Sequence, residues 1–280
     1  MSDAARQLRT LLGASEMVVA PFVYDAVQAK MAAAAGFRAL YLTGFGTAAA
    51  RGYPDLGLLT MTEMVDSVRT IAAAVGVPLI CDADTGYGNP LNVMRTVRAY
   101  EAAGAAALHI EDQVWPKRCG FFAGKEVIPL SDMVAKVRAA CDARRTPDLL
   151  IIARTDALQA HGWDEVERRA RAYCAAGADL IFVDGILIVD DLDTYAHRLN
   201  DLPRLYNGQL VPVAAVAQRG FQVMIHPATL AVVYTALRTA LAELRSTGAV
   251  AGANDASVFG ELIRLLGVPE MLALGKKYDG

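Results

Sequence analysis

The chain has 280 residues, of which 54% are hydrophobic and 20% charged, so it can bury one large core in a single domain spanning residues 1–280. Its net charge of -3 and its lack of any basic run interleaved with aromatic residues argue against a nucleic-acid partner and favour a small molecule. Residues 1–20 carry no signal pattern, and no apolar run approaches the roughly 18 residues of a membrane span. We therefore expect a cytoplasmic protein with no membrane partner.

Apolar runs alternate with helical segments along the chain. The apolar runs predict strands at 17–23, 39–43, 78–84, 107–112, 149–156, 180–184, 204–207 and 222–226. Helices are expected at 4–12, from Asp25 to Ala35, at 61–75 and 91–103, from Ser131-Asp132 onward, at 163–175 and 189–199, after the seventh strand, and at 229–246. A long loop is expected from Gly44 to Gly57, and Thr60 with Glu63 predicts a capping box before the helix at 61–75.

The apolar runs are nearly continuous in Val, Ile and Leu, which is typical of parallel strands that are buried on both faces. Eight strand–helix units favour a closed (β/α)₈ TIM barrel. The competing architecture is a doubly wound open sheet, but no G-x-G-x-x-G follows the first strand. Two further apolar segments, at 256–266 and 268–275, are not required by a barrel, and we expect these extra C-terminal helices to dock on a neighbouring chain.

Cysteine spacing argues against structural metal and disulfide roles. The sequence contains Cys81, Cys119, Cys141 and Cys174 without any C-x-x-C spacing. We interpret three of them as buried fillers. Cys119 differs, because Lys117 and Arg118 precede it in a polar loop that contains glycine, where two cations would favour the thiolate.

Polar residues end most of the predicted strands, and in a barrel the active site lies at this end of the strands. These residues are Thr43, Asp82, Asp84, Glu111, Arg154, Asp156, Asp184, Asn207 and His226. A barrel built for stability alone would not need so many polar groups at one rim. The sequence therefore predicts an active site there.

The stretch at 80–88, ICDADTGYG, places two carboxylates at the end of a strand. Residues two apart in a strand point the same way, so Asp82 and Asp84 are expected to share a face and to need a cation. Hard oxygen ligands suit Mg²⁺ or Mn²⁺; the alternative is a pair of capping or loop carboxylates. We predict an acidic cluster of Asp82, Asp84 and Glu111 around one divalent cation, with Arg154 opposite to bind an acidic substrate through its carboxylate.

Three candidate residues have structural alternatives. His109 lies one layer below Glu111 and is more readily interpreted as a core histidine than as a ligand. Asp156 could serve only as an ion-pair partner of Arg154. His226 could be either a catalyst at the rim or a structural donor, and the sequence gives no preference.

Four ordered motifs resemble the isocitrate lyase / phosphoenolpyruvate mutase superfamily. They are DADTGYG at 82–88, ALHIEDQ at 107–113, PKRCG at 116–120 and ARTD at 153–156, and the likeness runs from about residue 21 to at least residue 185. The resemblance implies a (β/α)₈ barrel, Mg²⁺ and the enolate of a 2-oxo acid as intermediate. It also implies a homotetramer, built as a dimer of dimers that exchange their last helix.

The resemblance also assigns roles to individual residues. It implies that Asp84 is the direct metal ligand, that Asp82 and Glu111 hold metal-bound water, and that Cys119 belongs to the loop of the carbon–carbon lyases. The catalytic residues that it implies are Cys119, Arg154 and Glu111. The substrate-binding residues that it implies are Thr43, Gly44, Phe45, Asp55, Gly120, Arg154, Asp184 and Asn207.

The implied reaction is a retro-aldol cleavage of a 2-hydroxy dicarboxylate to a 2-oxo acid such as pyruvate, with Cys119 as the proton donor. Three departures loosen the substrate assignment. Phe121 replaces the usual loop histidine, Asp184 stands where a longer glutamate is usual, and the segment around Asn207 lacks the Thr/Glu pattern of the members that cleave tricarboxylates. We therefore expect a smaller or more apolar substituted malate rather than 2-methylisocitrate.

Three other functions remain open. One is decarboxylation or hydrolysis of an oxaloacetate-like 2-oxo acid, in which Cys119 would matter less and His226 could matter more. Another is phosphonate C–P chemistry, against which Cys119 argues. The last is a non-catalytic binding descendant of the family, which the change at Phe121 would permit.

Overall fold

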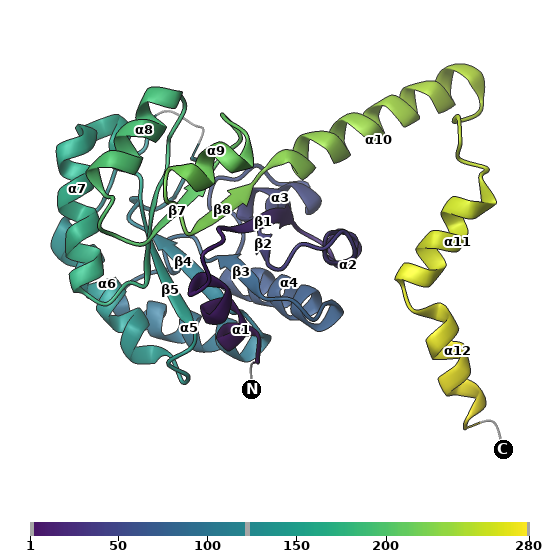
Figure 1. The fold of residues 1–280 in the computed structure, drawn as a ribbon, viewed down its shortest axis with the longest axis horizontal. Helices are drawn as coiled ribbons and strands as arrows, with labels where there is room; N and C mark the ends of the chain where they lie inside the picture. Colours follow the sequence, from purple (N-terminus) through teal and green to yellow (C-terminus); the bar gives the residue numbers. More distant parts are fainter. Residues whose placement is uncertain (1–2, 121–123, 279–280) are drawn as a thin grey trace.

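The computed structural model describes residues 3–120 and 124–278, which form a closed barrel of eight parallel strands surrounded by helices (Figure 1). The strands are β1 (Val18–Val23), β2 (Leu40–Leu42), β3 (Leu79–Asp82), β4 (Ala107–Glu111), β5 (Leu150–Thr155), β6 (Leu180–Val183), β7 (Arg204–Asn207) and β8 (Val223–His226). Each strand pairs with the next, and β8 closes the barrel by pairing with β1. The predicted (β/α)₈ barrel is confirmed.

Most helices lie close to their predicted positions. They are α1 (Asp3–Leu12), α2 (Ala26–Ala34), α3 (Gly44–Ala50), α4 (Met61–Ala74), α5 (Pro90–Ala103), α6 (Leu130–Ala143), α7 (Leu158–Ala175), α8 (Val189–Arg198), α9 (Val213–Gln218), α10 (Ala228–Thr247), α11 (Ala256–Leu265) and α12 (Val268–Lys276). Asp25 caps α2 by accepting a hydrogen bond from the Gln28 amide. Thr60 and Glu63 form the predicted capping box of α4.

Three local predictions are wrong. The segment after Thr43 begins with α3 rather than with a loop, because the Thr43 side chain accepts a hydrogen bond from the Gly46 amide and caps a helix. Helix α6 is preceded by Pro129 and has no side-chain cap, so Ser131 does not open it. Of the three cysteines expected to be buried, only Cys81 is buried, whereas the other two are half-exposed.

The predicted geometry of the two carboxylates after β3 also needs correction. The strand ends at Asp82, and Asp84 has a φ of 46°, in the left-handed region. The two side chains therefore do not share the face of a strand. Instead, Asp82 Oδ1 accepts a hydrogen bond of 3.0 Å from the Asp84 amide, so that Asp82 stabilises the turn that carries Asp84.

Aromatic rings fill the barrel interior beneath the carboxyl ends of the strands. Phe22 packs against Tyr41 with ring centroids 4.7 Å apart, and Tyr41 stacks on His109 at 5.8 Å. His109 in turn meets the edge of Phe182 at 5.4 Å. This packed layer forms a rigid floor for the polar groups at the rim.

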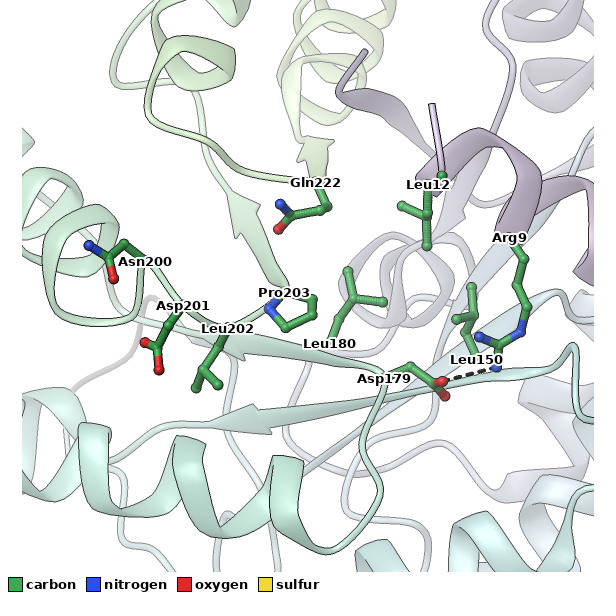
Figure 2. A pocket seen from close by; sticks show the side chains of 11 residues that line it. Arg9, Leu12, Leu150, Asp179, Leu180, Asn200, Asp201, Leu202, Pro203 and Gln222 are labelled. Atoms are coloured by element: carbon green, nitrogen blue, oxygen red, sulfur yellow. Dashed lines mark hydrogen bonds and ion pairs between the residues drawn. The ribbon is translucent and has the colours of Figure 1, made fainter. Parts of the chain in front are cut away.

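A cavity of about 430 Å³ lies at the opposite end of the barrel, between α1 and the starts of β5 to β8 (Figure 2). Arg9 Nη2 lies 2.9 Å from Asp179 Oδ1, and this ion pair joins α1 to the start of β6. Asp179 Oδ2 also accepts hydrogen bonds from Arg144 and from the Ile151 amide. The charged groups here pair with one another, as expected of the end of a barrel that serves stability.

Helix α10 begins beside β1 and extends outward, and α11 and α12 follow it outside the ring of barrel helices, where α11 contacts α2 (Figure 1). Within the described ranges, no residue of α10, α11 or α12 is buried. Their exposed apolar side chains are Val232, Val233, Tyr234, Leu237, Leu241, Leu244, Val258, Phe259, Leu262, Met271, Leu272 and Leu274. Among the helices of the described chain, none is both long enough and apolar enough to cross a membrane.

Candidate active site

A cavity of about 300 Å³ opens at the carboxyl ends of the strands, where the sequence predicts the active site. Nine predicted site residues line it: Thr43, Phe45, Asp55, Asp82, Cys119, Gly120, Arg154, Asp184 and Asn207. The remaining lining residues are Phe22, Tyr41, Gln209, Pro227, Leu230 and Ala231. All eight strands, or the segments that directly follow them, thus contribute residues to one hollow.

The glycine after β2 is needed for a close approach between two of these loops. The Gly44 amide donates a hydrogen bond of 3.1 Å to Asp82 Oδ2. A Cβ at position 44 would lie 3.0 Å from Asp82 Cγ, so a larger residue would push the two segments apart. Gly44 therefore does not line the cavity itself but orients the carboxylate of Asp82.

Arg154 lies at the centre of the acidic residues of the rim. Its Nε and Nη2 atoms each lie 2.9 Å from a carboxylate oxygen of Asp156, which gives a bidentate pair. Its guanidinium also contacts Glu111 at 3.2 Å and Asp184 at 3.1 Å. Asp156 is therefore an ion-pair partner of Arg154, the structural alternative that the sequence left open.

Two buried lysines from the loop between β4 and α6 enter this cluster, and the sequence did not predict either contact. Lys117 Nζ lies 2.7 Å from Asp84 Oδ1 and also pairs with Asp55. Lys125 Nζ lies 2.8 Å from Asp156 Oδ1 and 3.1 Å from Asp184 Oδ2. The sequence predicted that Lys117 would favour the thiolate form of Cys119. Its ammonium group instead pairs with the carboxylates of Asp55 and Asp84.

The pKa values of these groups follow from burial and from their neighbours. Burial lowers the pKa of Lys117, but Asp84 and Asp82 outweigh it and hold that pKa well above its usual range. Burial raises the pKa of Asp84 to about 6, although Lys117 opposes the shift. Burial also raises the pKa of Glu111 well above its usual range. Burial therefore favours the neutral, protonated forms of Asp84 and Glu111, and a positive partner is what would keep these carboxylates charged.

The carboxylate oxygens of the site are chemically suited to bind a divalent cation, but the three side chains are not positioned around a common point. Among the described residues, no three His, Cys, Asp or Glu side chains stand together as metal ligands, so the predicted cluster of Asp82, Asp84 and Glu111 is not arranged around one point. Nevertheless, in the described part of the chain both carboxylate oxygens of Glu111 are buried without a hydrogen-bond donor, and Asp84 Oδ1 is buried with the Lys117 ammonium group beside it. Only ion pairs with Lys117 and Arg154 balance them. Such oxygens are the ligands that Mg²⁺ prefers.

Cys119 is placed at the edge of the cavity by its own backbone. Its amide donates a hydrogen bond of 3.1 Å to the Asp55 carbonyl, and the residue is only 8% exposed. Cys119 therefore lies at the cavity and is largely protected from solvent. Phe121, at which the sequence departs from the related lyases, lies outside the described residues.

The two candidate histidines have structural contacts. His109 is fully buried, and its Nε2 lies 2.8 Å from the hydroxyl of Tyr41. Burial lowers the pKa of His109 to about 4, so it is neutral at physiological pH, as expected of a core histidine. His226 Nδ1 accepts a hydrogen bond of 3.3 Å from the Ala228 amide at the start of α10, which agrees with its structural alternative.

Fold and site together define a (β/α)₈-barrel enzyme whose polar groups gather at the carboxyl end of the strands. Residues 8–245 match the family model described as phosphoenolpyruvate phosphomutase. The chain therefore belongs to the isocitrate lyase / phosphoenolpyruvate mutase superfamily. Several of the similar proteins are named as lyases or hydrolases.

Three similar proteins illustrate this range. The chain is 41% identical to the 2,3-dimethylmalate lyase of Eubacterium barkeri over 99% of this chain and 98% of the relative. The structure of an oxaloacetate acetylhydrolase with the inhibitor 3,3-difluorooxalacetate superposes with a TM-score of 0.93 at 38% identity, covering 99% of this chain and 97% of that one. A phosphonopyruvate hydrolase in complex with oxalate and Mg²⁺ gives a TM-score of 0.89 at 30% identity, with 99% of both chains covered.

Proposed function

We propose that the chain is a Mg²⁺-dependent carbon–carbon lyase that cleaves a substituted 2-hydroxy dicarboxylate to a 2-oxo acid such as pyruvate. The observation that carries the proposal is the cavity at the rim, which Cys119 and Arg154 line together. The buried carboxylate of Asp84 and the buried carboxylate oxygens of Glu111, which lack hydrogen-bond donors among the described residues, lie next to it. The similarity to 2,3-dimethylmalate lyase supports the same reaction class.

In this mechanism Arg154 binds a carboxylate of the substrate through its planar guanidinium group. Asn207 has a buried side-chain oxygen without a hydrogen-bond donor among the described residues, and it accepts from the substrate hydroxyl. The hydroxyl gives its proton to the Glu111 carboxylate, whose pKa burial raises well above its usual range, and becomes the carbonyl of the 2-oxo acid as the adjacent carbon–carbon bond breaks. Cys119 then donates a proton to the enolate carbon of the departing acid.

Asp84 would ligate Mg²⁺ directly, and Asp82 and Glu111 would hold its water ligands. When bound, the ion would neutralise negative charge on the substrate oxygens. Mn²⁺ has similar ligand preferences and could replace it.

The wall of the cavity favours an alkyl-substituted malate. Apolar side chains of Phe22, Phe45, Pro227, Leu230 and Ala231 line it together with the charged groups. Methyl substituents would be buried against these side chains, whereas a third carboxylate would lack a charged partner there. A substituted malate such as dimethylmalate therefore fits better than 2-methylisocitrate.

Hydrolysis or decarboxylation of oxaloacetate is the second candidate function. The close structural similarity to oxaloacetate acetylhydrolase favours it. Phosphonate C–P chemistry is a weaker candidate, because Cys119 lies at the cavity, and the family resemblance associates this cysteine with the carbon–carbon lyases.

A substrate panel tests the proposal. Malate, 2-methylisocitrate, 2,3-dimethylmalate and oxaloacetate are each supplied with Mg²⁺, and release of a 2-oxo acid is followed. We expect the fastest cleavage with 2,3-dimethylmalate, its loss with EDTA and its recovery with Mg²⁺ or Mn²⁺. Turnover of oxaloacetate alone would favour the second function, and full activity in EDTA would contradict a role for the metal.

We further propose that α10 to α12 pack against a second copy of the chain in a homotetramer built as a dimer of dimers. The exposed apolar side chains of these helices support this proposal, because surfaces of this kind mark interfaces. Replacing Leu237 and Leu241 together by glutamate is expected to lower the mass measured by light scattering. The control is Arg245→Glu, a polar change near the end of the same helix. A monomeric wild-type protein would contradict the proposal.

A further inference from the structure

The ammonium group of Lys125 joins the segment that carries Cys119 to two strands of the barrel. Lys125 Nζ donates to the Gly120 carbonyl at 2.8 Å, and it contacts Asp156 at 2.8 Å and Asp184 at 3.1 Å. These three acceptors match the three donors of an ammonium group. The Lys125 side chain is only 1% exposed, so water does not compete for these contacts.

Gly120 also lies directly against the Asp184 carboxylate. A Cβ built at position 120 would overlap Asp184 Oδ2 and approach Oδ1 to 2.8 Å. Gly120 does not have a positive φ, so the backbone conformation would accept other residues. Close packing against Asp184 is therefore what requires glycine here. Two independent features, a charge-assisted hydrogen bond and a steric fit, thus hold the same peptide in place.

We propose that Lys125 is a positioning residue that fixes Cys119 at the edge of the cavity by holding the Gly120 peptide against Asp184. This inference rests on the proposed role of Cys119 as proton donor. Cys119 precedes Gly120 directly, and both residues line the cavity. Proton transfer requires donor and acceptor within hydrogen-bond reach, so a small displacement of this segment is costly to the reaction.

Electrostatics explains why a lysine is suited to this position. Asp156 and Asp184 place two negative charges beside the Gly120 carbonyl, which is itself a hydrogen-bond acceptor. Arg154 neutralises part of this charge but does not contact Gly120 in the described structure. Only a cation that reaches both the carbonyl and the carboxylates satisfies all three acceptors. Without it, the acceptors would repel one another and the segment would move outward.

Two variants test the inference, one at each residue of the contact between Lys125 and Gly120. Lys125→Met removes the ammonium group, and Gly120→Ala leaves it in place but forces the segment away from Asp184. The matched control is Lys136→Met, because Lys136 is also buried and donates to a backbone carbonyl, that of Thr85, away from Cys119. Circular dichroism and thermal melting check that each variant is folded.

The first measurement is alkylation of Cys119 by iodoacetamide without substrate, followed by mass spectrometry of the peptide that contains it. We expect both variants to react faster than the wild type, and Lys125→Met to react about 10- to 100-fold faster, the change expected from losing a hydrogen bond to a charged group. The control should react at the wild-type rate. Unchanged reactivity of Cys119 in folded Lys125→Met and Gly120→Ala proteins would overturn the inference.

The second measurement is the steady-state rate with the best substrate of the panel. We expect kcat to fall about 100-fold while KM changes less than about threefold, because proton donation is displaced and substrate binding is not. A rise in KM alone would show that Lys125 acts on substrate binding and would also overturn the inference. Because alkylation is measured without substrate, it tests the position of Cys119 even if the proposed lyase reaction is not observed. If Lys125→Met does not fold, Gly120→Ala alone decides between the outcomes.

Discussion

Replacing Cys119 by serine is expected to lower kcat for release of the 2-oxo acid by about 10²- to 10⁴-fold, the usual contribution of a positioned proton donor. A serine hydroxyl has nearly the same size but is a much weaker acid than a thiol. The substituted residue would still line the cavity, since the backbone bond from residue 119 to the Asp55 carbonyl does not depend on the side chain. The measurement is the steady-state rate with 2,3-dimethylmalate and Mg²⁺.

The matched control is Cys141→Ser. Cys141 is half-buried on α6, and its thiol contacts the Gly177 carbonyl rather than the cavity. This variant should keep the wild-type rate. If only oxaloacetate is turned over and Cys119→Ser loses only a few-fold of that rate, the result would favour decarboxylation or hydrolysis of oxaloacetate, in which the cysteine is less important. The comparison therefore separates the two candidate functions as well as testing the role of Cys119.

Replacing Arg154 by lysine is expected to lower kcat/KM by about 10²- to 10³-fold, as for other losses of a positioned charged donor. The guanidinium contacts three carboxylates at once, those of Asp156, Glu111 and Asp184. An ammonium group is a single point charge and cannot reproduce the planar, bidentate geometry. The decrease is therefore expected even though the positive charge is kept.

Replacing Arg154 by methionine separates charge from geometry. Removing the guanidinium would leave three buried carboxylates without this partner, and we expect unfolding in urea to show a destabilisation of about 3–5 kcal/mol. The control is Arg168→Met, since Arg168 is exposed on α7 and pairs only within the helix; its effect should stay within about 0.5 kcal/mol. Wild-type activity in Arg154→Lys would contradict the assignment of Arg154 as the substrate-binding arginine.

The barrel could be predicted from sequence because its signals are local. Buried parallel strands require continuous apolar runs, and the helices between them require caps such as Asp25 and Thr60, which lie next to them in the chain. The polar residues that end the strands could also be predicted. In a closed parallel barrel all these ends meet at one rim, so residues such as Thr43 and Asn207 line the same cavity.

Several features of the site could not be predicted from local patterns. Asp84 leaves the strand because its φ is 46°, a conformation set by the turn and by its bond to Asp82. Lys117 and Lys125 lie in a long loop whose path has no periodic signal, so nothing in the sequence indicated which carboxylates they would reach.

The sequence alone thus determined the architecture, the rim where the site lies and the acidic residues that form it, because these depend on hydrophobic periodicity and on strand ends. Only the tertiary structure decided how the charges pair. Ion pairs form between residues far apart in the chain, such as Lys125 and Asp184, and depend on how the loops pack above the barrel. Burial increases the free-energy cost of leaving any of these charges unpaired, because a charge removed from water needs a partner within the protein.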